Sequence, residues 1–247
     1  PAMSADGMYL AVPHNGTTGA AKLITYKWDS VDARYEATAN PDAVPSGTTP
    51  AGTAMSADGT YLAVSHNGTT APAYLITYKW NGANNRYEQT AAPDTAPSGS
   101  ATKMAMSADG TYLAVIHAGT TGIPNLITYK WVEANNRYEV TAAPGTSPSI
   151  CYAIAMSQNG SYLVVGKSSA PRLMCYVWNG DNNRYETTTA PDKAPSETVY
   201  AVAISSDSST LVAGGSMLNT YKWDAVDGRY EATAAPESAP FSALIQG

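Results

Sequence analysis

The feature that most constrains this chain is a block of sequence that returns five times along its 247 residues. In its clearest copies the block reads Met-Ser-Ala-Asp-Gly, followed shortly by Tyr-Leu-Ala-Val, and it begins at Met3, Met55, Met106, Met156 and Ile204. The steps between successive copies are 52, 51, 50 and 48 residues. A period of this length indicates one supersecondary unit that is copied and stacked, because a single copy cannot bury its own apolar face.

Two further markers recur in phase with the block. Each repeat carries an Arg-Tyr-Glu motif, and a single tryptophan lies six residues before its arginine. The arginines are Arg34, Arg86, Arg137, Arg184 and Arg229. The tryptophans are Trp28, Trp80, Trp131, Trp178 and Trp223. We interpret both sets as structural markers of the repeat.

One repeat, residues 99–147, reads as four strands. Apolar or alternating segments are expected to form strands near 100–107, 112–117, 126–131 and 137–142. The dipeptide Asp109-Gly110 predicts a tight turn between the first two, because both residues tolerate positive φ. Proline, glycine and serine after the fourth strand predict a linker to the next repeat.

Four strands in a unit of this length match the blade of a β-propeller. The wording AMSADGTYLAVSHNG, followed by YLITYKW, resembles WD-repeat-like blades, and it is closest to the tandem propeller repeats of tailed-phage and prophage structural proteins. The Trp-Asp dipeptide itself is incomplete, since Asp follows Trp only at Asp29 and Asp224.

The predicted fold is therefore all-β: a five-bladed β-propeller with four antiparallel strands per blade, forming a single domain over 1–247. The expected blades are 1–47, 48–98, 99–147, 148–194 and 195–240, with 241–247 completing the first blade. The spacing from each linker proline to the next block is matched by the two chain ends taken together. The N- and C-terminal segments are thus expected to pair and close the ring. An excerpt of a larger ring would have the same phase, and this alternative stays open.

Composition excludes some partners. The net charge is −6 and the 14 basic residues form no run, so no nucleic-acid surface is expected. No apolar stretch is long enough to cross a bilayer, so no membrane insertion is expected. Charged residues make up only 14% of the chain, which favours an extracellular, virion-associated or cell-surface location.

The loops after the second strand, together with the linkers, supply candidate ligand-binding residues. They are His14, Asn15, His66, Asn67, His117, Asp42, Asp94 and Asp192. Such side chains suit hydroxyl-rich ligands, and the arrangement resembles the inter-blade sites of five-bladed lectins of the tachylectin type. Alternatively, each histidine ends its strand by bonding to a neighbouring segment. One histidine per blade cannot converge on one ion, so no metal and no cofactor are expected.

Two smaller predictions concern side-chain pairs. The aspartates of the first turn, such as Asp58, are expected to face the arginine of the same repeat, such as Arg86, in a surface ion pair or beside an arginine-to-carbonyl bond. Cys151 and Cys175 are expected to be separated by a strand and to remain unbridged thiols.

Catalysis is not expected. On the innermost strands only Lys103 and Glu197 are ionisable, and no repeat holds a distinct catalytic set. The sequence therefore predicts no enzyme, but a non-catalytic, rigid binding or structural module of an exported or virion-associated assembly. Its partners would be proteins of that assembly or surface glycans. The alternative is a multivalent carbohydrate-binding lectin with inter-blade sites, and a glycosidase or lactonase is less favoured.

Overall fold

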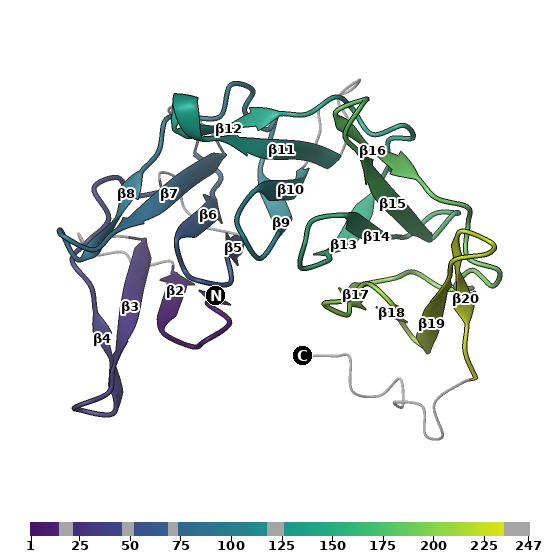
Figure 1. Cartoon of the computed structure of the whole chain (residues 1–247), viewed down its shortest axis with the longest axis horizontal. Helices are drawn as coiled ribbons and strands as arrows, with labels where there is room; N and C mark the ends of the chain where they lie inside the picture. Colours follow the sequence, from purple (N-terminus) through teal and green to yellow (C-terminus); the bar gives the residue numbers. More distant parts are fainter. Residues whose placement is uncertain (15–21, 46–51, 69–73, 118–125, 235–247) are drawn as a thin grey trace. The chain divides into compact units, whose positions relative to one another are not determined.

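The computed structural model describes residues 1–14, 22–45, 52–68, 74–117 and 126–234 (Figure 1). Within them the chain forms five antiparallel sheets of four strands, each with its strands in chain order, and a 3-10 helix, η1 (Glu133–Asn135). This confirms the predicted all-β architecture with four antiparallel strands per repeat. The paired terminal segments concern residues 241–247, which lie outside the described residues, so closure of the ring stays a prediction.

The chain divides into two compact units, Pro1–Ile123 with Ile127–Thr141, and Pro124–Leu126 with Ala142–Gly247. Each sheet lies within one of the predicted blade ranges. The first unit contains the sheets of the first three repeats. Their strands are β1 (Ala2–Met3), β2 (Tyr9–Pro13), β3 (Leu23–Asp29) and β4 (Arg34–Ala37); β5 (Thr53–Met55), β6 (Tyr61–Ser65), β7 (Leu75–Asn81) and β8 (Arg86–Gln89); and β9 (Ala101–Met106), β10 (Tyr112–His117), β11 (Leu126–Val132) and β12 (Arg137–Val140).

The second unit contains the sheets of the last two repeats. Their strands are β13 (Cys151–Met156), β14 (Tyr162–Lys167), β15 (Leu173–Asn179) and β16 (Arg184–Thr187); and β17 (Ala201–Ile204), β18 (Thr210–Gly214), β19 (Leu218–Asp224) and β20 (Arg229–Ala232). β14 lies between β13 and β15, so Cys151 and Cys175 are on strands that are not neighbours. Both thiols are free, as predicted.

The Ser-x-Asp-Gly turn between the first two strands is built from its own side chains. In repeat 2 the Ser56 hydroxyl donates to Asp58 Oδ1 at 2.7 Å and accepts the Tyr61 N–H at 2.9 Å. Gly59 has φ +74°, and a Cβ there would lie 2.4 Å from the ring of Tyr9 in the preceding sheet. Glycine is therefore required both by the turn and by the close approach of the neighbouring blade.

The tyrosine of the Arg-Tyr-Glu motif fastens this turn to the outer strand. The Tyr87 hydroxyl donates to the carbonyl of Gly59 at 2.6 Å, and the pair is buried. The same bond forms in every repeat. The other donors are Tyr35, Tyr138, Tyr185 and Tyr230, and their acceptors are Gly7, Gly110, Gly160 and Ser208.

The predicted pairing of turn aspartates with arginines is wrong. Arg86 contacts Glu88 at 3.2 Å, two residues along its own strand, while Asp58 is used by Ser56 and Thr60. Residues two apart on a strand lie on the same face, so the glutamate is the nearer partner. The carbonyl of the turn is bound by tyrosine, as described above, and not by arginine.

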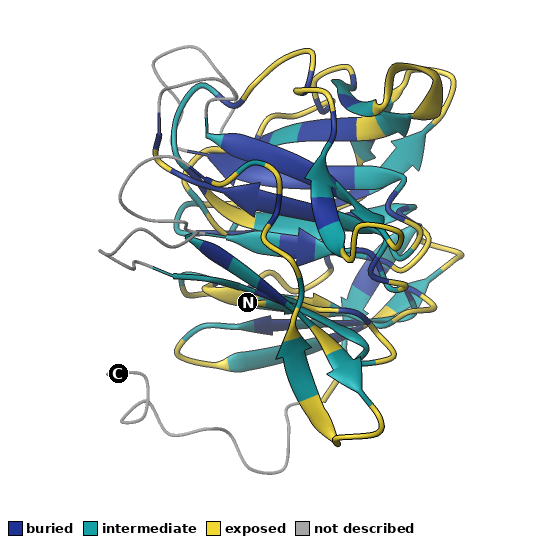
Figure 2. Ribbon diagram, turned by 90° about the vertical axis from the view of Figure 1, so that its left-hand side faces the viewer, coloured by how far each residue is buried: buried dark blue, intermediate teal, exposed yellow. Residues whose placement is uncertain are grey.

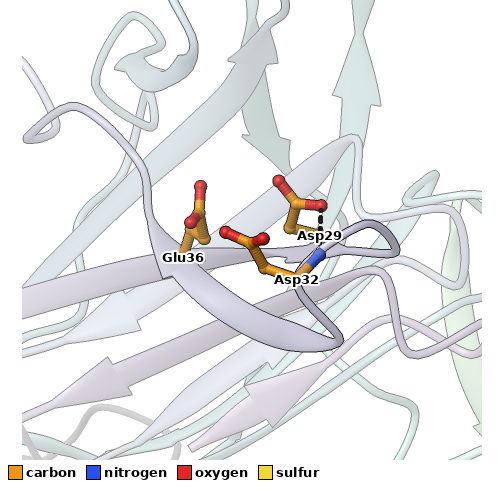
Figure 3. Close-up of side chains that lie close together, drawn as sticks. All are labelled: Asp29, Asp32 and Glu36. Carbon is orange, nitrogen blue, oxygen red and sulfur yellow. Dashed lines mark hydrogen bonds between the residues drawn. The ribbon is translucent and has the colours of Figure 1, made fainter.

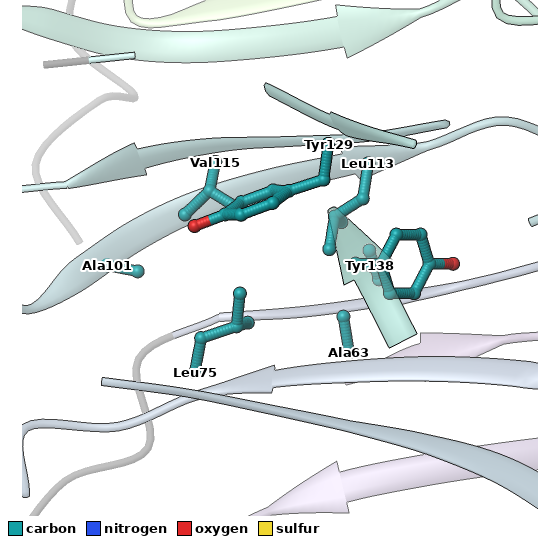
Figure 4. Close-up of a cluster of buried hydrophobic side chains, with 8 residues drawn as sticks. Ala63, Leu75, Ala101, Leu113, Val115, Tyr129 and Tyr138 are labelled. Carbon is teal, nitrogen blue, oxygen red and sulfur yellow. The ribbon is translucent and has the colours of Figure 1, made fainter. Parts of the chain in front are cut away.

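The core lies between neighbouring sheets. In the first unit, Ala63 and Leu75 of the second sheet pack against Leu113, Val115 and Tyr129 of the third (Figure 4). Trp131 packs beside this core, and its ring centroid lies 4.9 Å from that of Tyr61 in the preceding sheet. Trp80 and Trp223 contact a tyrosine of the preceding sheet in the same way. Figure 2 shows buried residues concentrated in the strands and exposed ones in the turns. Stacking of blades thus buries the face that one repeat alone would expose.

We expect Tyr87→Phe to lower the free energy of unfolding by about 1–2 kcal/mol, because it leaves the buried Gly59 carbonyl without its donor. Tyr35→Phe is the matched control, since the corresponding bond to Gly7 is only partly buried. Urea unfolding of both variants gives the comparison. Equal losses would contradict the view that burial sets the strength of this bond.

The stability of the fold should fall at low pH partly because of the aspartates in the turns between the first and second strands. The hydrogen bond from Ser205, with those from Ser209, lowers the pKa of Asp207 to about 2. A carboxyl with a depressed folded pKa stabilises the fold above its unfolded pKa of about 4, and this contribution is lost as the pH falls toward 2. The Asp207→Asn variant should therefore lose less stability than the wild type between about pH 4 and pH 2. The midpoints of urea unfolding at several pH values give the comparison.

Repeat 4 provides the reverse control for Asp207→Asn. Asn159 already replaces the aspartate there and accepts the Ser161 N–H at 3.0 Å. Asn159→Asp should therefore add acid sensitivity without breaking the turn. Identical pH profiles for the wild type and both variants would rule out the assignment.

Candidate functional site

The structure places the predicted histidines in or near the interior. His66 and His117 are 1% and 2% exposed, and His14 is half-buried. The Gly68 N–H donates to His66 Nδ1 at 3.1 Å, and Ser98 Oγ lies 3.4 Å from His117 Nδ1. These contacts fit the alternative in which each histidine ends its strand. A ligand-binding role for the histidines stays a prediction.

The predicted linker aspartates are hydrogen-bonded to the blade that follows them. Each accepts a backbone N–H from the outermost strand of the following sheet, at 2.7–2.8 Å. The pairs are Asp42 with Gln89, Asp94 with Val140, and Asp192 with Ala232. Asn67 is exposed, whereas Asn15 lies outside the described residues. The aspartates thus have a structural contact, and the structure does not gather them into one pocket.

Three other carboxylates gather at the turn between β3 and β4 (Figure 3). One oxygen each of Asp29, Asp32 and Glu36 lies within 4.8 Å of the other two. The Arg34 guanidinium is 3.1 Å from Asp32 and 2.7 Å from Glu36. Asp29 accepts the Val31 N–H at 2.7 Å. In the described part of the chain Asp29 makes no ion pair, so it is the carboxylate of the three that no cation neutralises.

In other repeats, asparagine side chains at this turn donate hydrogen bonds to the glutamate of the Arg-Tyr-Glu motif. In repeat 2, Asn81 and Asn84 donate to Glu88 at 2.9 and 2.6 Å, and these bonds lower the pKa of Glu88. Repeat 4 makes the equivalent bonds to its own glutamate. Repeat 1 instead places Asp29 and Asp32 at the amide positions. Repeats 2 and 4 therefore lack the cluster, whereas repeat 5 has Asp224, Asp227 and Glu231 at the same three positions, with Arg229 paired to the last two.

A cavity of about 280 Å³ adjoins the cluster. Lys27, Asp29 and Glu36 line it, together with Trp28, and Asn85 reaches it from the turn of the next blade. Its volume is near the lower end of the range of small-molecule sites, which is about 300–1,000 Å³. Acidic side chains and a lysine thus line one small space, and the Lys27 ammonium lies 5.8 Å from the centroid of the Tyr9 ring.

The second repeat forms a cavity of about 290 Å³ at the equivalent position. Lys79, Trp80 and Glu88 line it at the positions of Lys27, Trp28 and Glu36. Asn136 of the following blade takes the position of Asn85. Asn81 stands in place of Asp29. The two cavities differ in chemistry because the first contains the carboxylate of Asp29 beside that of Glu36, whereas in the second Glu88 is the lining carboxylate and accepts hydrogen bonds from Asn81 and Asn84.

The carboxylate cluster offers two kinds of chemistry. Hard divalent cations such as Ca²⁺ or Mg²⁺ prefer carboxylate oxygens, and Asp29, Asp32 and Glu36 could supply three of them. Arg34 already occupies oxygens of Asp32 and Glu36, which fits such an ion only if the guanidinium moves. Asp29 needs no rearrangement to act as a general base in the cavity.

Sequence reasoning missed this site, although its signal was present. Asp29 and Asp224 stand out as the two aspartates that follow a repeat tryptophan. We interpreted them as remnants of a dipeptide and not as chemistry. The symmetry of the repeat drew attention to residues that recur in most repeats, whereas two of the three clustered carboxylates, Asp29 and Asp32, have counterparts of the same kind only in repeat 5.

The comparisons with known proteins identify the fold. The structure is similar to that of a periplasmic gluconolactonase from Pseudomonas aeruginosa, with a TM-score of 0.63 and 16% identity. The match covers 95% of this chain and 70% of the gluconolactonase chain. A Bacteroides uniformis protein, provisionally named 6-phosphogluconolactonase, matches over 96% of this chain and 85% of its own, with a TM-score of 0.58 and 14% identity. The β-propeller domain of Swd1 from Myceliophteria thermophila matches over 96% of this chain and 68% of its own, with a TM-score of 0.58 and 12% identity.

No protein-family model matches the chain, and no curated protein is similar to it in sequence. At identities of 12–16%, the structural likeness shows a propeller fold. The Swd1 domain supports the resemblance to WD-type blades. None of these three structures is a phage protein, so the resemblance to phage repeats stays a prediction.

These comparisons correct two expectations. A non-catalytic binding or structural module was expected, and with it no enzyme, because the inner strands lack paired acids. Two of the similar propellers carry lactonase names, which overturns both expectations. The expectation rested on the innermost strands alone, where only Lys103 and Glu197 are ionisable. In the part of the chain that the structure describes, no helix is long and apolar enough to cross a membrane.

Proposed function

We propose that this chain is a propeller hydrolase of the lactonase type, which opens the cyclic ester of a sugar acid. The observation that carries the proposal is the match of almost the whole chain to propellers with lactonase names. The cavity beside Asp29 supports it, because ester hydrolysis needs a base for water and a cation for the developing oxyanion.

The residues of the cavity can divide this work. Asp29, which makes no ion pair with the described residues, accepts a proton from the water that attacks the carbonyl carbon. The Lys27 ammonium stabilises the oxyanion that forms on the carbonyl oxygen. As the ring C–O bond breaks, the proton passes from Asp29 to the leaving alkoxide, and the product is the open hydroxy acid. Trp28 gives the ring of the substrate an apolar wall.

An exported location belongs to the same proposal. One of the similar lactonases is periplasmic, and the sparse charge of the chain suits such a compartment. Protein or glycan partners within a surface assembly stay predictions.

The test is hydrolysis of glucono-δ-lactone by the purified chain. The rate is measured as proton release in excess of the spontaneous rate. Asp29→Asn should lower the enzymatic rate by about 100-fold or more, because it removes the base. Asparagine already stands at the equivalent position of repeats 2 and 4, so the fold should tolerate the change. Asp224→Asn, at the equivalent position of repeat 5, is the matched control and should leave the rate unchanged.

A second prediction concerns the oxyanion. Lys27→Met should lower the rate by about 100-fold, the usual effect of losing one oxyanion donor. The same substitution at Lys79, which lines the cavity of repeat 2, should have no effect on turnover. Full activity of both Asp29→Asn and Lys27→Met would exclude this cavity as the active site. Absence of any turnover of sugar-acid lactones would exclude the proposed function.

Multivalent carbohydrate binding is a second candidate, and the paired cavities favour it. They occupy equivalent positions in repeats 1 and 2 and differ by little in volume. Weak sites gain avidity through such repetition. Calorimetry would separate the two functions: binding of a sugar at two or more sites per chain, without turnover of any lactone, would favour the lectin.

A further inference from the structure

Two basic residues face each other in the fourth repeat. Lys167 ends β14, and Arg172 immediately precedes β15. The Lys167 N–H donates to the Arg172 carbonyl at 2.8 Å, which makes the two residues direct neighbours across the hairpin. Side chains of such neighbours project to the same face of a sheet, and like charges in this arrangement repel.

Neither cation has a counter-ion among the residues that the structure describes. Lys167 is only 4% exposed, and its ammonium contacts the Met174 thioether at 3.7 Å. The Nε of Arg172 is buried and has no hydrogen-bond partner. Among the described residues no carboxylate forms an ion pair with either side chain. A buried ammonium without an anionic acceptor is costly, so this arrangement needs an explanation.

The nearby thiol does not supply the missing charge. Cys151 is opposite Lys167 on the other neighbouring strand, β13. Burial raises the pKa of Cys151 to about 11, against an opposing effect of the Lys167 charge. The thiol is therefore protonated and neutral at physiological pH.

The double cation is specific to repeat 4. Repeats 2 and 3 carry His66 and His117 at the position of Lys167. At the position of Arg172 they carry Tyr74 and Asn125. Repeat 2 forms the corresponding hairpin with His66 and Tyr74, so the fold does not require a lysine and an arginine at these two places.

A cavity adjoins residues that neighbour the two cations, although neither Lys167 nor Arg172 lines it. A cavity of about 200 Å³ is lined by Pro171, next to Arg172 in sequence, and by Met174, which contacts Lys167. Ser168 and Ser169 complete the connection between the two basic residues and carry further donors. Arg and Lys together are the usual ligands of phosphate oxygens in proteins.

We propose that Lys167 and Arg172 form a binding site for a tetrahedral oxyanion, either inorganic phosphate or the phosphate group of a phosphorylated sugar. The anion accepts hydrogen bonds from the Lys167 ammonium and from the Arg172 guanidinium, and it cancels their repulsion. This inference does not depend on the proposed lactonase activity, because its residues lie in another repeat.

The test uses the full chain in phosphate-free buffer and measures binding by calorimetry and by thermal unfolding. Inorganic phosphate should bind saturably and raise the Tm of the wild type. Lys167→His and Arg172→Asn, which introduce the residues of repeat 3, should each weaken binding at least about tenfold, because each removes a charge-assisted bond. Lys193→Gln, at an exposed lysine of the same unit, should change nothing.

The outcomes are distinct. A hexose 6-phosphate that binds more tightly than phosphate, beside no binding of the free hexose, would identify a phosphate ester as the ligand, whereas preference for inorganic phosphate would identify the free ion. Equal Tm shifts in the wild type and in both hairpin variants would reduce the effect to general salt stabilisation and overturn the proposal. Absence of any phosphate binding by the folded wild type would overturn it as well.

Discussion

A buried tyrosine on the third strand of a blade holds that blade to the preceding linker. The hydroxyl of Tyr78 donates to the carbonyl of Ala43 at 3.0 Å, and Tyr129 makes the same bond to Thr95 at 2.9 Å. In the second unit, Tyr221 bonds Lys193 in this way. These side chains are fully buried, so each bond gives the tyrosine hydroxyl a hydrogen-bond partner that it would otherwise lack. The rest of the architecture depends on this junction, because it fixes where the linker of one blade meets the third strand of the next.

The two candidate sites arise where a repeat departs from its neighbours. Asp29 replaces the asparagine that donates a hydrogen bond to a glutamate in repeat 2, and this change leaves in a cavity a carboxylate that makes no ion pair with the described residues. Lys167 replaces a buried histidine and lies opposite Arg172. In both cases the conserved framework of hydrogen bonds keeps the backbone in place. A side chain can then change its chemistry without disturbing the packing that holds the sheet.

Much of the fold could be predicted from local pattern. Alternation and the Asp-Gly turns placed the strands within a few residues, and the strand between Cys151 and Cys175 excluded a disulfide. The partners of the charged side chains could not be predicted in this way. Asp58 and Arg86 are close in the topology, yet the arginine pairs with Glu88 because a strand places alternate residues on one face. The candidate site was missed for a related reason, since the distance between Asp29 and Glu36 depends on how the turn between their strands closes.

The sequence by itself determined the number of repeats, the four strands in each and the glycine that the first turn requires. These follow from the period of the pattern and from backbone sterics, which act over a few residues. Only the tertiary structure decided which recurring side chains are buried, which carboxylates share a cavity and which cations lack a partner. Burial and charge compensation are set by neighbours from other strands and other blades, and no local pattern carries that information.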